Sequence, residues 1–464
     1  RGGVMDIFVE FLPLWMFFAL AVLLFTGYPV AFILGGVGLA FALIGDAFGV
    51  FRLQQLALIP LRIFGGTMES PVLVAIPMFI FMGTMLEKSG VARDLLHALQ
   101  VLLRRVPGGL ALSVTLMGTI MAATTGIIGA SVVMMTLLAL PVMLDRNYSM
   151  PLATGTIAAS GTLGILIPPS IMLVIMADLL SVPVGTVFVG AIVPGLLLAS
   201  LYAVYIWSLC HWKPHLAPPL PDDIGPASRV EFWGMVLKSF VPPVLLIVIV
   251  LGSIFGGFAT PTEAAGVGAG GAVLLAAINR KLTWSVFVEV CQRSALTGGM
   301  LFGIFVGATC FSFIFRTLGG EHLIIEFIQA TGVGPWSILL VLMLMIFLLG
   351  FFFDWIEITL IVLPVFAPIV GLLDFGDHVG AWEGVTKENI IWFLVLAAVN
   401  LQTSFLTPPF GFALFYMKGV APPGVTIQHI YRGIIPFVVL QLIGLILCMA
   451  FPGLILWLPS YLLG

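Results

Sequence analysis

Long apolar runs restrict the fold of this chain more than any other feature. They cover residues 7–26, 28–45, 239–255 and 433–458, and each is close to the roughly 20 residues that cross a hydrocarbon core. Backbone groups inside lipid must bind one another, so such runs predict transmembrane helices. The runs are continuous rather than alternating, which excludes the strands of a β-barrel.

Composition supports a membrane location for most of the chain. Hydrophobic residues make up 61% and charged residues 8%, with a mean hydropathy of +1.21, whereas soluble domains carry about 25% charged residues. We therefore expect an all-α polytopic protein in a lipid bilayer. The net charge of −3 and the lack of a basic cluster give no reason to expect a nucleic-acid partner. The first run lacks a small-residue cleavage pattern, so we expect it to be a span rather than a signal peptide.

The cysteines and histidines predict no disulfide framework, metal site or cofactor. The cysteines are far apart, in mostly apolar segments, and we expect them to serve as small packing residues: Cys210, Cys291, Cys310 and Cys448. His211 and His215 have metal-like spacing. Pro214 interrupts a helical face between them, however, and no cysteine or carboxylate completes a ligand set.

Two halves of the chain repeat one plan. Residues 136–142 (TLLALPV) resemble 359–365 (TLIVLPV), and 166–169 (LIPP) resemble 406–409 (LTPP). A weaker third match aligns Pro29, Gly36 and Gly38 with Pro261, Gly268 and Gly270. Any single match between apolar segments could arise by chance, but three in the same order favour a duplication. The sequence thus predicts two inverted repeats, over residues 1–210 and 232–464.

The segment between the repeats sets the expected orientation. Residues 211–231 are the longest polar, proline-rich stretch and predict a linker outside the bilayer. Placing this linker in the cytoplasm puts most lysines and arginines on that side, as the positive-inside rule requires, and both termini on the other side.

Residues 91–105 place an apolar stripe opposite arginines and predict an interfacial amphipathic helix, with an acidic counterpart near 321–330.

Each repeat contains one stretch that suits a re-entrant hairpin, at residues 107–144 and 335–373. Both have an interrupted or polar centre flanked by apolar arms. Irregular backbone at membrane depth is tolerated only inside protein or beside a water-filled cavity. We therefore expect both hairpin tips to face a binding site, and to approach each other from opposite sides of the membrane.

A broken helix is expected after each hairpin, over residues 150–180 and 390–417. Polar or small residues precede a Pro-Pro pair in both. In the first, Ser160, Thr162 and Gly164 precede Pro168 and Pro169; in the second, Asn400, Thr403, Ser404 and Thr407 precede Pro408 and Pro409. Proline cannot donate to the preceding turn. Freed carbonyls suit Na+ and half-helix N-termini suit a substrate carboxylate, although a proline kink satisfied by nearby hydroxyls would explain either break alone.

Two carboxylates in the second hairpin, Asp354 and Glu357, leave two interpretations open. Carboxylates at membrane depth cost about 2.5–3.5 kcal/mol each on insertion scales and usually have a function, such as protonation, ion pairing or cation binding. A hairpin that opens to water would instead leave them hydrated. Glu263 differs, because Thr260, Pro261 and Glu263 form the pattern of a helix capping box.

Four segments together resemble one known family. They are residues 76–83 (IPMFIFMG), 167–170 (IPPS), 260–265 (TPTEAA) and 406–411 (LTPPFG). They are similar to the large membrane subunit of the tripartite ATP-independent periplasmic (TRAP) transporters, over essentially the whole chain. The resemblance implies a non-enzymatic elevator transporter of the bacterial inner membrane that imports a small organic acid with Na+. It also implies two partners, a small four-helix membrane subunit and a periplasmic substrate-binding protein.

The resemblance also implies two Na+ sites. The first maps to Thr125 with Gly164, Ile167 and Pro169, and Ser131 offers a further hydroxyl there. The second maps to the residues Ser404, Thr407 and Phe410 with the second hairpin. Family members often have glycine at the position of Ser404, and the DWIE segment at 354–357 departs from sialic-acid transporters. Substrate identity is therefore not transferred.

Two other functions share part of this pattern. A stand-alone Na+/carboxylate symporter would have the same repeats and breaks without needing a binding protein. An ion-translocating subunit of a respiratory complex would carry more lysine and glutamate within its spans and would not need paired Pro-Pro breaks. A primary pump is excluded for this chain because it contains no phosphate-binding GxxxxGK(S/T) loop.

Overall fold

The computed structural model describes residues 8–125, 128–220, 225, 228–408 and 411–463, and all regular structure in these ranges is helical. Seven helices in this part of the chain are long and apolar enough to cross a membrane. The expected class, an all-α multi-pass membrane protein, is confirmed.

The first half begins with two apolar helices, of which only the second is long enough to cross a membrane, and ends with a helix of 29 residues. Its helices are α2 (Leu12–Leu24), α3 (Val30–Ala47), η1 (Leu53–Ala57), α4 (Leu58–Ile63), η2 (Phe64–Met68), α5 (Ala75–Lys88), α6 (Val91–Leu102), α7 (Gly109–Thr125), α8 (Ile128–Asp145), α9 (Met150–Thr162), η3 (Leu163–Ile165), α10 (Ile171–Leu179) and α11 (Val184–Trp212).

The second half follows the same order after a short helix, η4 (Pro214–Leu216). Its helices are α12 (Arg229–Phe255), α13 (Pro261–Ile278), α14 (Trp284–Thr317), α15 (Gly320–Thr331), α16 (Pro335–Leu349), α17 (Trp355–Leu372), η5 (Gly376–His378), α18 (Glu388–Ser404), α19 (Phe412–Val420), α20 (Ile427–Ala450) and α21 (Gly453–Leu463). The longer helices correspond in order, whereas the η1–α4–η2 segment, the short helices η3, η4 and η5, and the terminal α21 have no counterpart among the described helices.

Packing between the halves follows the same correspondence. Helix α3 packs on α14, and its counterpart α13 packs on α5, the counterpart of α14. Both contacts depend on small residues: a Cβ at Gly307 would lie 2.3 Å from the Ala31 carbonyl oxygen, and one at Gly268 would lie 2.5 Å from the Met82 sulfur. Exchanging the halves therefore maps one interface onto the other, as expected for a duplicated architecture.

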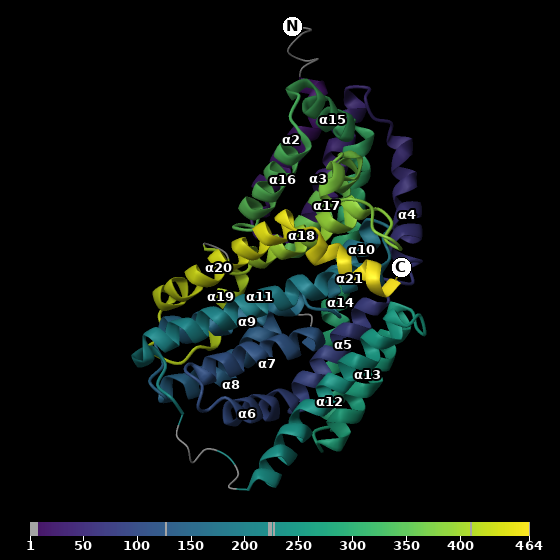
Figure 1. The fold of residues 1–464 in the computed structure, drawn as a ribbon. Helices are drawn as coiled ribbons and strands as arrows, with labels where there is room; N and C mark the ends of the chain where they lie inside the picture. The colour runs from purple at the N-terminus through teal and green to yellow at the C-terminus, as the bar shows by residue number, and fades with distance from the viewer. Residues whose placement is uncertain (1–7, 126–127, 221–224, 226–227, 409–410, 464) are drawn as a thin grey trace.

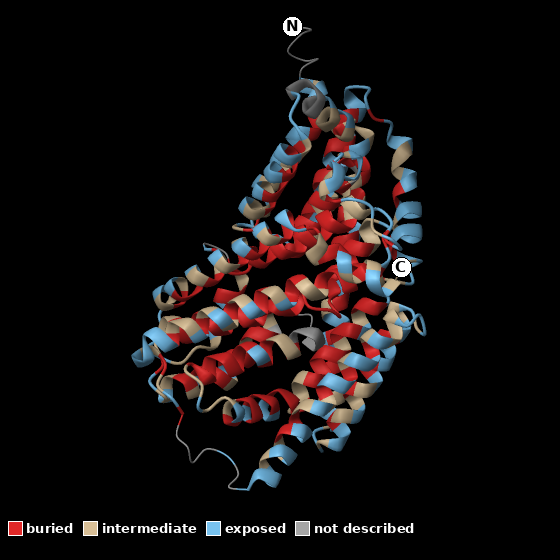
Figure 2. Cartoon of the chain, viewed as in Figure 1, coloured by how far each residue is buried: buried red, intermediate tan, exposed pale blue. Residues whose placement is uncertain are grey.

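The helices divide into two packed groups (Figure 1). Helices α9, α11 and α20 lie side by side, with α7 and α8 against α9 and with α16 and α17 against α18. Helices α5, α12 and α13 form a second group that crosses the first obliquely and also includes α14 and α3. Figure 2 shows the most continuous burial along α9 and α18, and every residue from Leu152 to Ile175 is buried.

Several predicted boundaries need correction. The apolar run at 433–458 is not one span, because α20 ends at Ala450 and α21 begins after Pro452. The amphipathic helix ends at Leu102 rather than 105, and Leu102 is exposed although Val91, Leu95 and Leu99 of its stripe are buried. Helix α11 continues to Trp212, so it extends into the predicted linker.

Candidate functional site

Both predicted hairpins are pairs of helices joined by a short connection. In the first, α7 ends at Thr125 and α8 begins at Ile128. In the second, α16 ends at Leu349 and α17 begins at Trp355. The connections lie at the centres of the predicted segments, which places one tip in each half of the chain.

The two tips line one cavity of about 120 Å³. Ile128 and Gly129 contribute from the first hairpin, and Asp354 to Ile356 from the second. The remaining lining residues come from α5, α14 and the broken helices: Ile80, Thr297, Met300, Leu301, Ile171, Phe405, Phe412 and Tyr416. A Cβ at Gly129 would lie 3.1 Å from the Tyr416 ring, so the small residue at the first tip admits this aromatic side chain.

Four helices begin at this cavity. Ile128, Trp355, Ile171 and Phe412 are the first residues of α8, α17, α10 and α19, and all four residues line it. The N-terminus of a helix carries a partial positive charge and unpaired N–H groups. Four such partial charges around one small space favour an anion, although the Asp354 carboxylate caps one of these helices and also lines the space.

The first break separates α9 from α10 over residues 163–170. Pro168 and Pro169 have no N–H groups, so the carbonyls four residues earlier, at Gly164 and Ile165, lack their helical donors. The Ser170 hydroxyl donates a hydrogen bond to the Ile165 carbonyl, and its oxygen accepts one from the Leu173 N–H at 3.4 Å. One side chain therefore satisfies a freed carbonyl and caps the next helix.

The second break separates α18 from α19. Three hydroxyls bond carbonyls within the preceding turns: Thr403 to Asn400 at 2.7 Å, Ser404 to Leu401 at 2.5 Å, and Thr407 to Thr403 at 2.9 Å. Each hydroxyl donates one hydrogen bond, and its oxygen keeps lone pairs that can face a cation.

Each hairpin packs tightly on the helix that precedes a break. A Cβ at Gly118 of α7 would lie 2.8 Å from the Ser160 Cβ, and one at Gly350, after α16, would lie 2.4 Å from the Ser404 Cβ. Asn400 also donates to the Met343 carbonyl of α16 at 2.7 Å. Hairpin and broken helix therefore form one packed unit in each half.

Asp354 and Glu357 have a structural role that the sequence pattern could have revealed. The Asp354 carboxylate accepts from the Trp355 N–H at 2.8 Å, and the Asp354 N–H donates to Glu357 at 3.2 Å. Together they form a capping box at the start of α17. Both are half-buried, and Asp354 also lines the cavity. The expected box of Thr260 and Glu263 is likewise present, with a Thr260 N–H to Glu263 distance of 2.7 Å.

The sequence-predicted residues are distributed unevenly over this site. Ser131, Ser160 and Thr162 are buried in the helices of the first half. Phe410 lies outside the described residues, as does the side chain of Thr125. Pattern reasoning missed Thr297, in the unbroken helix α14, and Tyr416, in α19 beyond the second break. The only sequence signal is that each lies four residues from another residue of the cavity, Leu301 and Phe412, and so shares a helix face with it.

These features define a multi-pass membrane protein in which two helical hairpins and two interrupted helices surround one small cavity. Residues 17–454 match the family described as the tripartite ATP-independent periplasmic transporter, DctM component. The chain belongs to this family, as the large membrane subunit of a TRAP transporter, and is a transport protein rather than an enzyme.

Relatives with assigned substrates span several organic acids. The chain is 32% identical to the C4-dicarboxylate TRAP transporter large permease protein DctM of Pseudomonas aeruginosa, over 85% of this chain and 88% of that protein. It is 27% identical to the sialic acid TRAP transporter large permease protein SiaM of Vibrio cholerae, over 95% and 97%.

Two further similarities concern architecture. The isethionate TRAP transporter permease protein DctMQ of Oleidesulfovibrio alaskensis is 29% identical over 96% of this chain and 66% of its own length, so that relative has additional sequence. The crystal structure of the Alcanivorax borkumensis YdaH transporter has a TM-score of 0.60 at 15% identity, covering 86% of this chain and 88% of that one. This likeness supports the fold alone.

Proposed function

We propose that this subunit imports a small organic acid with Na+, receiving it from a periplasmic substrate-binding protein. The four helix N-termini around one cavity are the observation that carries the proposal, because they favour an anion where both hairpin tips meet. A C4-dicarboxylate is the first candidate substrate, since a relative of that name is 32% identical.

The same proposal assigns Na+ to the two breaks. At the first, the ligands would be carbonyls of Gly164, Ile167 and Pro169 with a hydroxyl of Thr125 or Ser131. At the second, they would be the Thr407 hydroxyl with backbone oxygens at Ser404 and Phe410. Hard cations prefer such oxygen ligands, and the Pro-Pro pairs remove the donors that would otherwise occupy carbonyls.

The remaining polar residues near the breaks would position substrate or couple it to the ion. Ser160, Thr162, Asn400 and Thr403 precede the breaks, and Asp354 lines the cavity. Because Asp354 and Glu357 already cap α17, we propose that they shape the second tip.

Transport would proceed by an elevator movement in the bacterial inner membrane. The hairpins and broken helices form packed units, whereas α3, α5, α13 and α14 pack mainly on one another. We propose that the first set slides against the second, with the 211–231 linker in the cytoplasm and both termini in the periplasm. A small four-helix membrane subunit would complete the membrane part of the complex.

Uptake into liposomes tests this function. The subunit would be reconstituted with its small subunit, and labelled C4-dicarboxylate would be supplied on the binding protein. We expect uptake with an inward Na+ gradient and none with a proton gradient alone. Equal uptake under both gradients would contradict Na+ coupling. Full uptake of free substrate without the binding protein would indicate a stand-alone symporter instead.

A further inference from the structure

A second and larger cavity lies where α5 and α13 end. Its volume is about 1030 Å³, and it is lined by the ends of α5 and α13, the start of α6, one face of α8, and Lys238 of α12. The end of α5 is fixed to the end of α13, because the Asn279 amide donates to the Ser89 carbonyl at 3.1 Å. These two helix ends therefore form one continuous wall.

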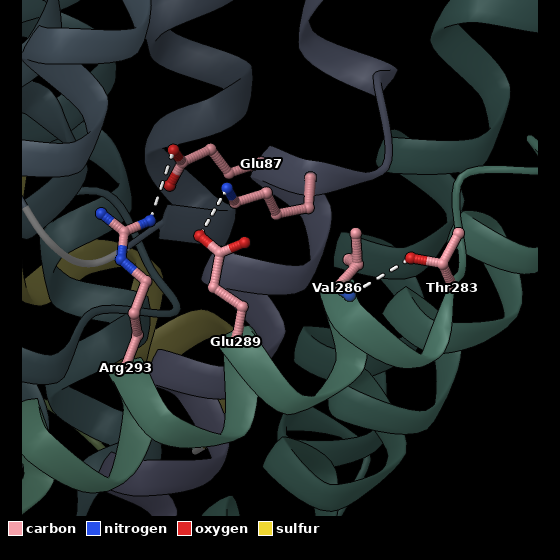
Figure 3. Close-up of polar contacts among 6 residues, drawn as sticks. Glu87, Thr283, Val286, Glu289 and Arg293 are labelled. Atoms are coloured by element: carbon pink, nitrogen blue, oxygen red, sulfur yellow. Dashed lines mark hydrogen bonds and ion pairs between the residues drawn. The ribbon is translucent and has the colours of Figure 1, made fainter.

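Positive charge dominates this cavity. Five cationic side chains line it, against the two carboxylates of Glu87 and Asp94: Lys88, Arg93, Lys238, Arg280 and Lys281. Ion pairs with α14 neutralise part of the set: Lys88 lies 2.6 Å from Glu289, and Glu87 lies 3.7 Å from Arg293 (Figure 3).

Four cations of the cavity remain without an ion-pair partner in the described part of the chain. They are Arg93, Lys238, Arg280 and Lys281. Lys281 passes over Gly90, where a Cβ would lie 3.7 Å from its Cε. A ligand that binds here would therefore be an anion with room for several charge contacts.

Apolar side chains line the remainder of the cavity, and two of them are well exposed. They are Val133, Met134, Leu137 and Leu138 of α8, together with Ile278 at the end of α13. Leu137 is 56% exposed and Ile278 is 65% exposed. A lining that is partly cationic and partly apolar suits an amphiphile, because a small hydrophilic acid gains nothing from the apolar side chains.

Tryptophans close in sequence to the cationic residues indicate that this cavity lies at the level of lipid headgroups. Trp284 begins α14, three residues after Lys281, and Trp233 lies five residues before Lys238; they are 79% and 55% exposed. Helix α13 ends at the same side, since only residues 279–283 separate it from α14. Exposed tryptophans at helix ends mark the interface between membrane and water.

We propose that this cavity binds an anionic phospholipid, with its headgroup on Arg93, Lys238, Arg280 and Lys281 and an acyl chain along Leu137. Basic pockets between transmembrane helices bind anionic headgroups in this manner. Since α8 belongs to one packed group and α12 and α13 to the other, the lipid bridges the two groups. This site is separate from the cavity at the hairpin tips and does not depend on the proposed substrate.

Native mass spectrometry of the purified subunit tests the proposal, with phosphatidylglycerol and phosphatidylethanolamine of identical chains as probes. We expect preferential retention of phosphatidylglycerol. The Lys238→Gln/Arg280→Gln/Lys281→Gln variant should bind it about 100-fold more weakly, because each cation near the surface contributes about one factor of five. Arg229→Gln, a charge change on α12 outside the cavity, is the matched control and should bind as the wild type does.

Two further experiments distinguish binding of a lipid from binding of a free anion. Leu137→Gln keeps all cations and should weaken phosphatidylglycerol binding, whereas millimolar glycerol phosphate or succinate should not displace it. Should the triple variant fail to fold, Lys238→Gln alone should weaken binding about fivefold. Equal retention of the two lipids, unchanged binding in the folded cation variants, or displacement by the free anions would overturn the proposal.

Discussion

The two helix breaks share a backbone plan but differ in where they place a hydroxyl group. In the first, Ser170 follows the Pro-Pro pair and bonds the Ile165 carbonyl. In the second, the residue at that position is Phe410, and the hydroxyl belongs instead to Thr407, before the prolines. Ile167 occupies the matching position of the first break.

This difference in position gives the two hydroxyl groups different roles, one in structure and the other in ion binding. Ser170 consumes a freed carbonyl and fixes the start of α10. Thr407 bonds the Thr403 carbonyl, which stays within the same helical turn, and its oxygen keeps free lone pairs. We therefore expect the side-chain hydroxyl to matter mainly for stability at the first break and mainly for ion binding at the second.

The largest effect is expected where the hairpins pack on the broken helices. Gly118→Ala and Gly350→Ala would each place a methyl group under 3 Å from a serine, and overpacking of this kind costs about 1–3 kcal/mol. Thermal unfolding of the purified variants should show a lower midpoint for both. Gly36→Ala and Gly299→Ala are matched controls, because a Cβ there meets nothing within 4 Å. Unchanged midpoints in both hairpin variants would contradict the tight packing, and an unchanged midpoint in only one of them would show that the two units differ.

A smaller loss of stability is expected from Ser170→Ala. It leaves the Ile165 carbonyl without its hydroxyl donor and removes the cap of α10, at a cost of about 1–2 kcal/mol. Ser170→Thr keeps the hydroxyl and should restore most of the stability in the same thermal assay. If Ser170→Ala were as stable as the wild type, the structural reading of the first break would be wrong.

The smallest effect is expected from Ile167→Val. This residue is 8% exposed and can offer only its backbone carbonyl to an ion, so removing one methylene should change packing by about 1 kcal/mol and leave the Na+ dependence of uptake unaltered. Uptake measured over a range of Na+ concentrations checks this. A shifted Na+ dependence would show that the side chain positions the first site.

The helical class could be predicted from apolar length, and the interruptions in the helices from glycine and Pro-Pro pairs, because these features act locally on the backbone. Residues 335–373 contain α16 and α17, and residues 390–417 contain most of α18 and most of α19. The cavity itself could not be predicted, since Tyr416 and Thr297 reach it only through tertiary packing. The capping role of Asp354 and Glu357 was present in the DxxE spacing but was obscured by their expected depth in the membrane.

Thr407→Val provides the most direct test of ion binding at the second break. The substitution keeps the shape of the side chain and removes its oxygen, whereas Thr407→Ser keeps the oxygen. In liposomes with both partners and an inward Na+ gradient, Thr407→Val should raise the Na+ concentration for half-maximal uptake about tenfold, which corresponds to about 1.4 kcal/mol. Thr407→Ser should stay near the wild type. An unchanged Na+ dependence in Thr407→Val would contradict the account by removing this hydroxyl from the site.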